Sequence, residues 1–375
     1  MRRAVGLKLI AGLAAAGLAL TACSSGSSTS GTTSAAASAA TSAAASGSAE
    51  ASGSAAAGAE ITGDPSSIKI GLAYDIGGRG DQSFNDLAAS SLDRATAEGV
   101  TVVGELTAGA GEPDSAKVDR LNQLIDSGAT DVLAIGFAYA GPVTEVAPAN
   151  PDVRFAIVDS TVDAPNVASL VFAEEEGSYL VGVAAGKKTT TNKVGFIGGV
   201  NVPLIQKFQA GFEAGVKAAN PDATVTVKYI TEPPDFSGFN SPQQGETIAT
   251  GMYDEGIDII YAAAGGSGAG VFKAAKTTGN LGIGVDSDQY NIASLADVRD
   301  VIMTSMLKGV DVATWDYIAN AANGTPLSGE HRYDLSNDGV GYSTSGGQID
   351  DLVPDIEAAK EQIVSGAVTV PSTTS

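Results

Sequence analysis

The sequence predicts a two-lobed α/β protein in which each lobe is a Rossmann-like, doubly wound block around a mostly parallel sheet. Three observations support this prediction. Short apolar, β-branched runs alternate with helical patterns, the alternation starts again near residue 192, and a long body follows the N-terminal region. The alternation is typical of βαβ units. A body of about three hundred residues is more than one core usually supports.

The first block begins with "IKIGLAY", which we expect to form a buried strand because it is short, apolar and followed by a turn. Helical patterns and further apolar runs then follow in regular succession. The predicted elements are strands at 68–74, 100–106, 130–138 and 154–160, and helices at 83–99, 113–128 and 141–149.

The second block repeats the arrangement, starting from "NKVGFIGG". Its predicted elements are strands at 192–199, 223–230, 257–264 and 281–288, and helices at 202–220, 241–256 and 267–279. The C-terminal part adds a strand at 301–308 and helices at 310–324 and 354–366, and we expect it to cross between the lobes.

The predicted body covers residues 67–370 and divides into two lobes connected by a hinge. The first lobe is expected to hold about 67–174 and 288–330, and the second about 175–287 and 331–370. In doubly wound folds a ligand binds at the carboxyl ends of the strands. We therefore expect a crevice between lobes that close on the ligand.

The N-terminus predicts export and attachment to a membrane. Residues 1–22 have a basic start, an apolar run and small residues, as in a secretion signal. Leu20 to Cys23 resemble the lipobox of bacterial lipoproteins, and Cys23 is the only cysteine. We expect lipidation at Cys23, and thus a protein anchored on the extracytoplasmic face of the cell membrane, although a signal peptide cleaved elsewhere is the alternative. Residues 23–66, rich in Ser, Ala and Gly, read as a flexible tether.

The charge of the chain excludes some partners. It carries 43 acidic against 21 basic residues, a formal net charge of −22. Nucleic-acid binding depends on a basic footprint, so nucleic acid is not an expected partner.

No second apolar run reaches the length of a membrane span. We expect the body to act as a monomer.

The turn "DIGGRGDQSFN" between the first strand and helix provides the first candidate ligand residues. It matches neither the P-loop nor the dinucleotide-binding pattern, so phosphate binding is weakly supported. Asp75 ends the strand, Ser83 is expected to cap the helix with Asp86 three residues later, and Phe84 and Asn85 start the helix at the crevice mouth. Phe84 packing into the core and Asp81 acting as a turn former are the plain alternatives.

Two further aspartates repeat this arrangement. Asp159 ends "FAIVD" and Asp286 ends "GIGVD", each after an apolar run. With Asp75 they predict one shared site of carboxylates. Ionised carboxylates only accept hydrogen bonds, so the site suits sugar hydroxyls, amines or ring N–H groups and repels phosphates. Lys308 would balance charge there, although the sequence alone favours an exposed strand end for this lysine.

The glycines of "AAAGGSGAGVF", with Gly265 and Gly266 first, follow a predicted strand and open a helix. They permit close approach of the backbone to an uncharged ligand, or simply tight packing of strand against helix. Both alternatives remain open.

The sequence holds little that supports catalysis. His331 is the only histidine, and no metal-ligand spacing or GxSxG turn is found. We therefore expect neither an enzyme nor a metal or cofactor. Two aspartates acting as acid and base in a hydrolase remain arguable without a supporting motif.

Several of these stretches together resemble the basic membrane protein family, the purine nucleoside-binding lipoproteins that serve ABC transporters. The resemblance is carried, in order along the chain, by "DIGGRGDQSFN", "FAIVDS", "VFAEEEGSYLVGVAAG", "KVGFIGG", "FQAGFEAGV", "GIGVDSDQ" and "TSMLK". It implies a type I periplasmic-binding-protein fold that captures a nucleoside and delivers it to an ABC-type permease.

The resemblance also implies roles for individual residues. Phe84 would stack on the base, Asp75, Asn85 and Asp159 would make polar contacts, Asp286 would bind the ribose, Lys308 would reach the ligand, and Gly265 and Gly266 would lie close to it. Phe208 is expected as the second stacking ring, with Phe236 and Phe239 as competitors, and the stretch "TEPPDFSGFNSPQQGE" departs from the family pattern there. A neutral sugar is the alternative ligand, and a nucleoside or glycoside hydrolase and an extracellular sensor or adhesin are the alternative functions.

Overall fold

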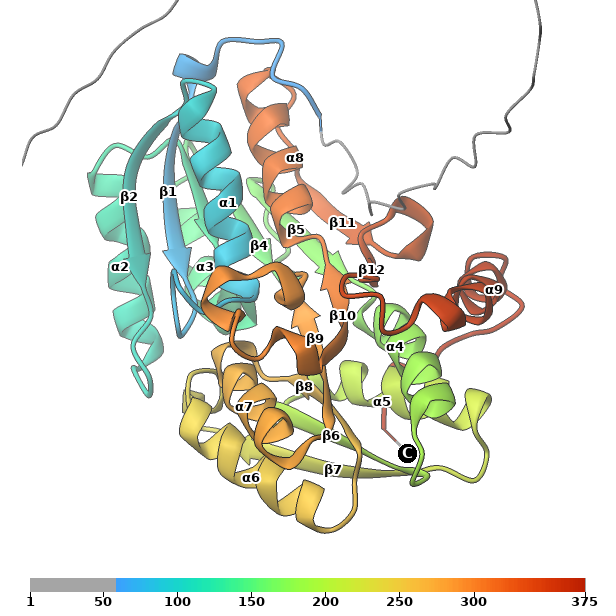
Figure 1. Ribbon diagram of the computed structural model, residues 1–375. Helices are drawn as coiled ribbons and strands as arrows, with labels where there is room; N and C mark the ends of the chain where they lie inside the picture. Colours follow the sequence, from blue (N-terminus) through green and yellow to red (C-terminus); the bar gives the residue numbers. More distant parts are fainter. Residues whose placement is uncertain (1–58, 375) are drawn as a thin grey trace, which may run out of the picture. The chain divides into compact units, whose positions relative to one another are not determined.

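The computed structural model describes residues 59–374, and the two six-stranded sheets of this part form two lobes (Figure 1). The predicted signal peptide, Cys23 and most of the predicted tether lie outside the described residues. Within the described part of the chain, no helix has the length and apolar composition needed to cross a membrane.

The sheet of the first lobe has the order β11-β5-β4-β3-β1-β2, and all of its strands run parallel. Helices α1 and α8 pack together on one face, and α2 and α3 on the other (Figure 1). The bounds are β1 Lys69–Tyr74, α1 Phe84–Ala97, β2 Thr101–Thr107, α2 Asp114–Asp126, β3 Asp131–Ala134, α3 Ala140–Ala149, β4 Arg154–Val158, β5 Val167–Phe172, α8 Val310–Ala322 and β11 Gly329–Tyr333.

The sheet of the second lobe has the order β12-β10-β9-β8-β6-β7, parallel except for the antiparallel pair β10 and β12. Helices α4 and α5 cover one face and α6 and α7 the other. The bounds are α4 Glu174–Lys188, β6 Lys193–Val200, α5 Pro203–Ala219, β7 Thr224–Thr231, α6 Pro242–Asp254, β8 Ile259–Ala263, α7 Gly268–Thr278, β9 Leu281–Asp286, β10 Ile302–Lys308, β12 Val340–Tyr342 and α9 Val353–Val364.

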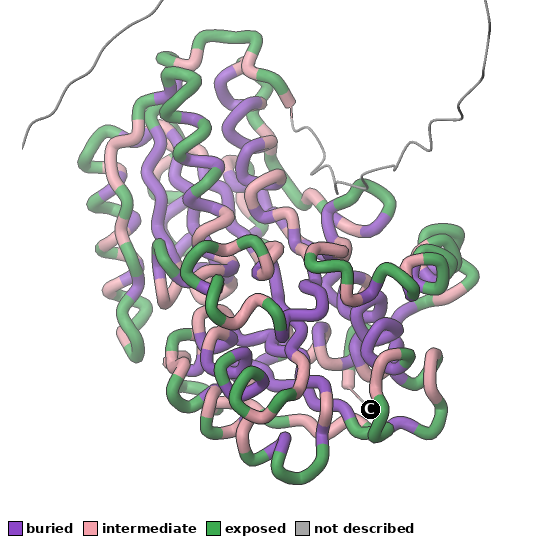
Figure 2. Tube along the Cα trace, in the orientation of Figure 1, coloured by how far each residue is buried: buried purple, intermediate pink, exposed green. Residues whose placement is uncertain are grey.

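The central strands are mostly apolar between their ends because both of their faces are covered by helices. In Figure 2 these strands are buried, whereas the helices alternate between buried and exposed residues. Strands β3 and β8, for example, are buried at every position. This burial explains why the strands appear in the sequence as continuous apolar runs instead of alternating patterns.

The chain crosses between the lobes three times, and these crossings correct the predicted division. The crossings lie between β5 and α4, between β10 and α8, and between β11 and β12. The strand at 302–308 was predicted in the first lobe, but it pairs with β9 and β12 in the second sheet. Residues 329–333 were placed mostly in the predicted second lobe without a predicted strand, but they form β11, which pairs with β5 in the first.

The predicted end of the tether at residue 66 is also wrong, because residues from 59 onward are fastened to helix α8. The Trp315 Nε1 donates to the Ala59 carbonyl over 2.7 Å. The backbone N–H groups of Thr62 and Gly63 both donate to Asn323 Oδ1, at 2.7 and 2.8 Å. The folded body therefore begins no later than Ala59.

Candidate functional site

A cavity lies between the two lobes, at the carboxyl ends of strands from both sheets. It contains about 570 Å³ of space free of protein atoms, including the part open to solvent. Eight of the nine predicted ligand residues line it: Asp75, Phe84, Asn85, Asp159, Phe208, Gly265, Asp286 and Lys308. The ninth, Gly266, is not among the lining residues.

The turn after β1 is held by a network that differs from the predicted capping by Ser83. The Asp81 carboxylate accepts hydrogen bonds from the backbone N–H groups of Ser83, Asn85 and Asp86, at 2.9 to 3.1 Å. Ser83 caps nothing with its side chain, although it is the residue immediately before α1. The prediction that Ser83 caps the helix is therefore wrong, and Asp81 satisfies the free N–H groups of the helix.

Asn85 and Asp75 are tied together by the same network. Asn85 Oδ1 accepts from the Asp75 N–H over 3.1 Å, and Asn85 Nδ2 donates to Asp81 Oδ2 over 2.8 Å. Asn85 thus lines the cavity while its amide holds the turn in place. Burial raises the pKa of Asp75 to about 6, and burial also raises the pKa of Asp81 to about 6 despite its hydrogen bonds.

The other two aspartates occupy equivalent positions in the two lobes and share an unusual backbone conformation. Asp159 follows β4 with φ 68°, and Asp286 ends β9 with φ 64°. Residues other than glycine seldom adopt this left-handed region, and such strain is found mainly at functional sites. Burial raises the pKa of Asp286 and raises that of Asp159 to about 7.

Lys308 is buried beside these carboxylates, so the sequence-based preference for an exposed strand end is wrong. Its Nζ lies 2.6 Å from Asp159 Oδ1 and 3.1 Å from Glu174 Oε1, and its side chain is 1% exposed. Burial lowers the pKa of Lys308, but the charges of Asp159, Glu174 and Asp286 outweigh it, and the pKa is raised overall. The lysine therefore stays charged and partly neutralises the aspartate cluster.

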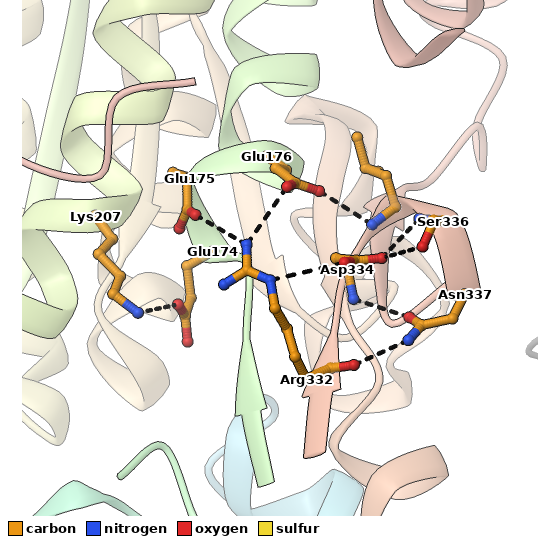
Figure 3. Close-up of polar contacts among 9 residues, drawn as sticks. Glu174, Glu175, Glu176, Lys207, Arg332, Asp334, Ser336 and Asn337 are labelled. Atoms are coloured by element: carbon orange, nitrogen blue, oxygen red, sulfur yellow. Dashed lines mark hydrogen bonds and ion pairs between the residues drawn. The ribbon is translucent and has the colours of Figure 1, made fainter. Parts of the chain in front are cut away.

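Glu174 was not predicted from the sequence and connects the site to the crossings between the lobes. It begins α4, immediately after the first crossing, and its Oε2 also forms an ion pair with Lys207 Nζ at 3.2 Å. Figure 3 shows its neighbours Glu175 and Glu176 turned toward Arg332 of β11, at 3.3 and 3.5 Å. Charged side chains thus link the crossings at β5, β10 and β11.

Aromatic rings from both lobes line the cavity. Phe84 of α1 and Phe208 of α5 lie with ring centroids 5.3 and 5.4 Å from Lys308 Nζ. Phe137, which follows β3, and Phe239 of the second lobe have ring centroids 6.5 Å apart. Of the predicted competitors of Phe208, Phe239 lines the cavity, whereas Phe236 is not among the lining residues and contacts Phe137, with centroids 5.9 Å apart.

Two glycines bring backbone close to the site. Gly136 has φ 107°, and a Cβ there would overlap Asp75 Oδ2. Gly265, with φ 53°, packs against the Phe239 carbonyl, where a Cβ would be 3.1 Å from the oxygen. Gly136 and Phe137 were not predicted from the sequence, although they come soon after the buried strand β3.

The site offers little catalytic chemistry. His331 lies on β11 with its Nε2 3.1 Å from the Ser328 carbonyl, and it does not line the cavity. Among residues 59–374, no group of three His, Cys, Asp or Glu side chains is arranged to hold a metal ion. The arrangement of rings, acceptor carboxylates and one buried cation is suited to binding a polar, aromatic or sugar-like molecule.

Comparisons with known proteins agree with the fold. The profile of the Bmp family, described as ABC transporter substrate-binding protein PnrA-like, matches residues 68–374. A solute-binding protein of an ABC transporter system from Aeropyrum pernix has a similar structure, with a TM-score of 0.71 and 27% identity, covering 82% of this chain and 94% of that chain.

Three relatives show the range of names in this group. The "CD4+ T-cell-stimulating antigen" of Listeria monocytogenes is 37% identical over 80% of this chain and 87% of its own length. The ABC transporter nucleoside-binding protein BmpA of Lactococcus lactis is 33% identical over 82% and 90%. An uncharacterized lipoprotein of Pyrococcus horikoshii is 31% identical over 79% and 77%.

These findings confirm the predicted family and the two-lobed α/β fold. They identify the chain as a substrate-binding protein that binds a small molecule and serves a permease, and not as an enzyme. Because a family profile and relatives above 30% identity cover nearly all of the body, the chain belongs to the Bmp family of ABC transporter substrate-binding proteins.

Proposed function

We propose that this protein captures a purine nucleoside between its lobes and delivers it to an ABC-type permease. The observation that carries the proposal is the combination of Phe84 and Phe208 with the carboxylates of Asp75, Asp159 and Asp286 around one cavity. A purine base stacks on aromatic rings with about 1–3 kcal/mol per base. The ribose hydroxyls donate hydrogen bonds to the carboxylates. The name of the Lactococcus lactis relative supports the same class of ligand.

A screen of ligands by thermal shift tests this proposal. The panel holds inosine, guanosine, adenosine, cytidine, uridine, ribose, galactose and the nucleoside monophosphates. A ligand that binds only the folded state raises the melting temperature by mass action, so micromolar binders are detected at millimolar concentration. We expect shifts from purine nucleosides and none from monophosphates, because the buried carboxylates repel phosphate. Shifts from sugars alone would assign the protein to sugar uptake instead, and shifts from monophosphates would contradict the proposal.

We also propose that Cys23 carries a lipid that anchors the protein to the extracytoplasmic face of the membrane. The lipobox-like sequence before Cys23 and the lipoprotein name of the Pyrococcus horikoshii relative support this proposal. The test is mass spectrometry of the protein from cell membranes, together with a Cys23→Ala variant. We expect a diacylglyceryl mass on the wild type and release of the variant from the membrane fraction. An unmodified Cys23 in membrane-bound protein would contradict the proposal.

We further propose that the body acts as a monomer. The cavity is lined by residues of both lobes of one chain, so one chain carries a whole site. Light scattering coupled to size exclusion should give the mass of one chain with and without inosine. A stable dimer in both conditions would contradict this part of the proposal.

A further inference from the structure

The segment Gln82–Ser83 of the first lobe lies against residues Val285–Gln289 of the second lobe, at the cavity. Ser83 Oγ donates to Asp286 Oδ2 over 2.6 Å and lies 3.2 Å from the Val285 carbonyl. In the other direction, Ser287 Oγ and Gln289 Nε2 both donate to the Gln82 carbonyl, at 3.1 and 2.9 Å. Three hydrogen bonds, donated by Ser83, Ser287 and Gln289, therefore join two short segments of opposite lobes.

Local structure frees Ser83 for this contact. A serine before a helix normally uses its hydroxyl to cap the helix, but here the Asp81 carboxylate takes those N–H groups. Ser83 is fully buried. Its Oγ is closer to Asp286 Oδ2, at 2.6 Å, than to the Val285 carbonyl oxygen, at 3.2 Å, so the hydroxyl donates to the carboxylate of the other lobe. Gln82 is held in the left-handed region, with φ 61°. Such a conformation persists where surrounding contacts fix it, and the two donors from the second lobe supply such contacts.

We propose that Gln82 and Ser83 form a latch between the lobes, in which Ser83 positions the Asp286 carboxylate for the ligand when the lobes are closed. Asp286 lines the cavity, and within residues 59–374 its Oδ1 makes no hydrogen bond, so that oxygen is free to accept from a ligand hydroxyl. The proposal deepens the proposed function, because it rests on Asp286 accepting from the ligand. Ser83 is thus a positioning residue, which acts on the ligand through Asp286.

The electrostatics of Asp286 provide a readout that a purely structural serine would not change. Burial disfavours the ionised form of Asp286 and raises its pKa, Lys308 of β10 and the Ser83 hydroxyl favour that form, and Glu174 of α4 disfavours it. Asp159 and Tyr261 of β8 are also close enough to interact electrostatically with this carboxylate. Removal of the Ser83 hydroxyl leaves all of these groups in place. It therefore raises the pH below which Asp286 becomes protonated and stops accepting.

The experiment compares Ser83→Ala, Ser287→Ala and the control Ser91→Ala with the wild type. Ser91 is a buried serine of α1 whose hydroxyl donates within its own lobe, to the Ala88 carbonyl over 2.8 Å. Calorimetry with inosine measures affinity across pH, and stopped-flow fluorescence measures release. We expect Ser83→Ala to weaken binding about tenfold or more, because a hydrogen bond to a charged group is lost. The acid limb of its affinity profile, which is the pH range over which inosine binding is lost on acidification, should also move to higher pH.

Ser287→Ala separates the two parts of the latch. It removes a bond to the Gln82 carbonyl and leaves Ser83 and Asp286 paired, so release should be faster while the acid limb stays at the wild-type pH. Ser91→Ala should change neither. If Ser83→Ala binds inosine as the wild type does, or its acid limb does not move, the proposal is overturned. If Ser83→Ala does not fold, the proposal is overturned when Ser287→Ala releases inosine at the wild-type rate.

A measurement without ligand keeps this test apart from the proposed function. Spin labels are placed on cysteines introduced at the exposed residues Glu98 and Asp254, one in each lobe, in the full chain carrying Cys23→Ser. Pulsed electron spin resonance then gives the distribution of distances between the lobes. We expect Ser83→Ala and Ser287→Ala to shift it toward longer distances relative to the wild type. If no nucleoside binds the wild type, the proposed function fails while this shift still supports the latch. Identical distributions would overturn the latch.

Discussion

Replacing Lys308 by methionine removes the cation that is buried among the carboxylates of the site. The Lys308, Asp159 and Glu174 side chains are only 1%, 5% and 1% exposed, and Nζ lies 2.6 and 3.1 Å from the two acids. Removing one member of a buried ion pair leaves an uncompensated charge and costs about 3–5 kcal/mol. We therefore expect Lys308→Met to lower the free energy of unfolding by about that amount near neutral pH.

The pH dependence of this loss gives the reasoning a second check. Without Lys308, the pKa of Asp159 rises further, because the nearby positive charge that lowers it is gone. An acid with a raised folded-state pKa contributes stability at low pH that is lost as the pH rises through that pKa. The loss in Lys308→Met should therefore be larger at about pH 8 than at about pH 5.

Urea denaturation followed by far-ultraviolet circular dichroism measures both effects. The matched control is Lys276→Met, which breaks the exposed pair with Asp300, whose side chains are 47% and 60% exposed. Such a surface pair contributes about 0–1 kcal/mol. If Lys308→Met were no less stable than Lys276→Met, or if its loss did not grow with pH, the assignment of Lys308 as the buried counter-charge would be refuted.

Three further predictions follow from the site and the N-terminal contacts. Gly136→Ala should weaken inosine binding at least tenfold in calorimetry, because φ 107° is strained for alanine and its Cβ would displace Asp75; unchanged affinity would contradict this. Burial raises the pKa of Asp75 to about 6, so the stability that this group contributes in the wild type is lost as the pH rises from about 4 to above 6. Asp75→Asn removes this group, and the free energy of unfolding measured in urea should therefore depend less on pH. The shift corresponds to about 3 kcal/mol at most, and equal slopes would refute it. Asn323→Ala should speed proteolysis near Thr62, measured by mass spectrometry, since Asn323 Oδ1 holds that segment; unchanged cleavage would contradict the fastening.

The order of strands and helices was largely predictable because the central strands are buried on both faces and appear as continuous apolar runs. Two of the four edge strands, β11 and β12, were not predicted. Strand β11, with the sequence "GEHRY", is mostly exposed and polar at the edge of its sheet, so it carries no apolar signal. The strand at 302–308 was predicted but given to the wrong lobe, since sequence order does not show which sheet a late strand joins.

The candidate site was predictable where a chemical group stands directly after a strand. Asp75, Asp159 and Asp286 follow this rule and line one cavity. Glu174 was missed because it begins a helix whose acidic first turn reads as ordinary helix-dipole compensation. The partner of Ser83 was missed because its acceptor is 203 residues away, and a serine before a helix has a nearer local explanation.

The central claim is that the cavity receives a neutral nucleoside through rings and acceptor carboxylates. Calorimetric titration with inosine and with inosine 5′-monophosphate tests it most directly, since the two ligands share base and ribose and differ only in the phosphate. We predict micromolar or tighter binding of inosine and no measurable heat with the monophosphate, because the buried acids repel an added anion. Equal or tighter binding of the monophosphate, or no binding of inosine, would contradict the account.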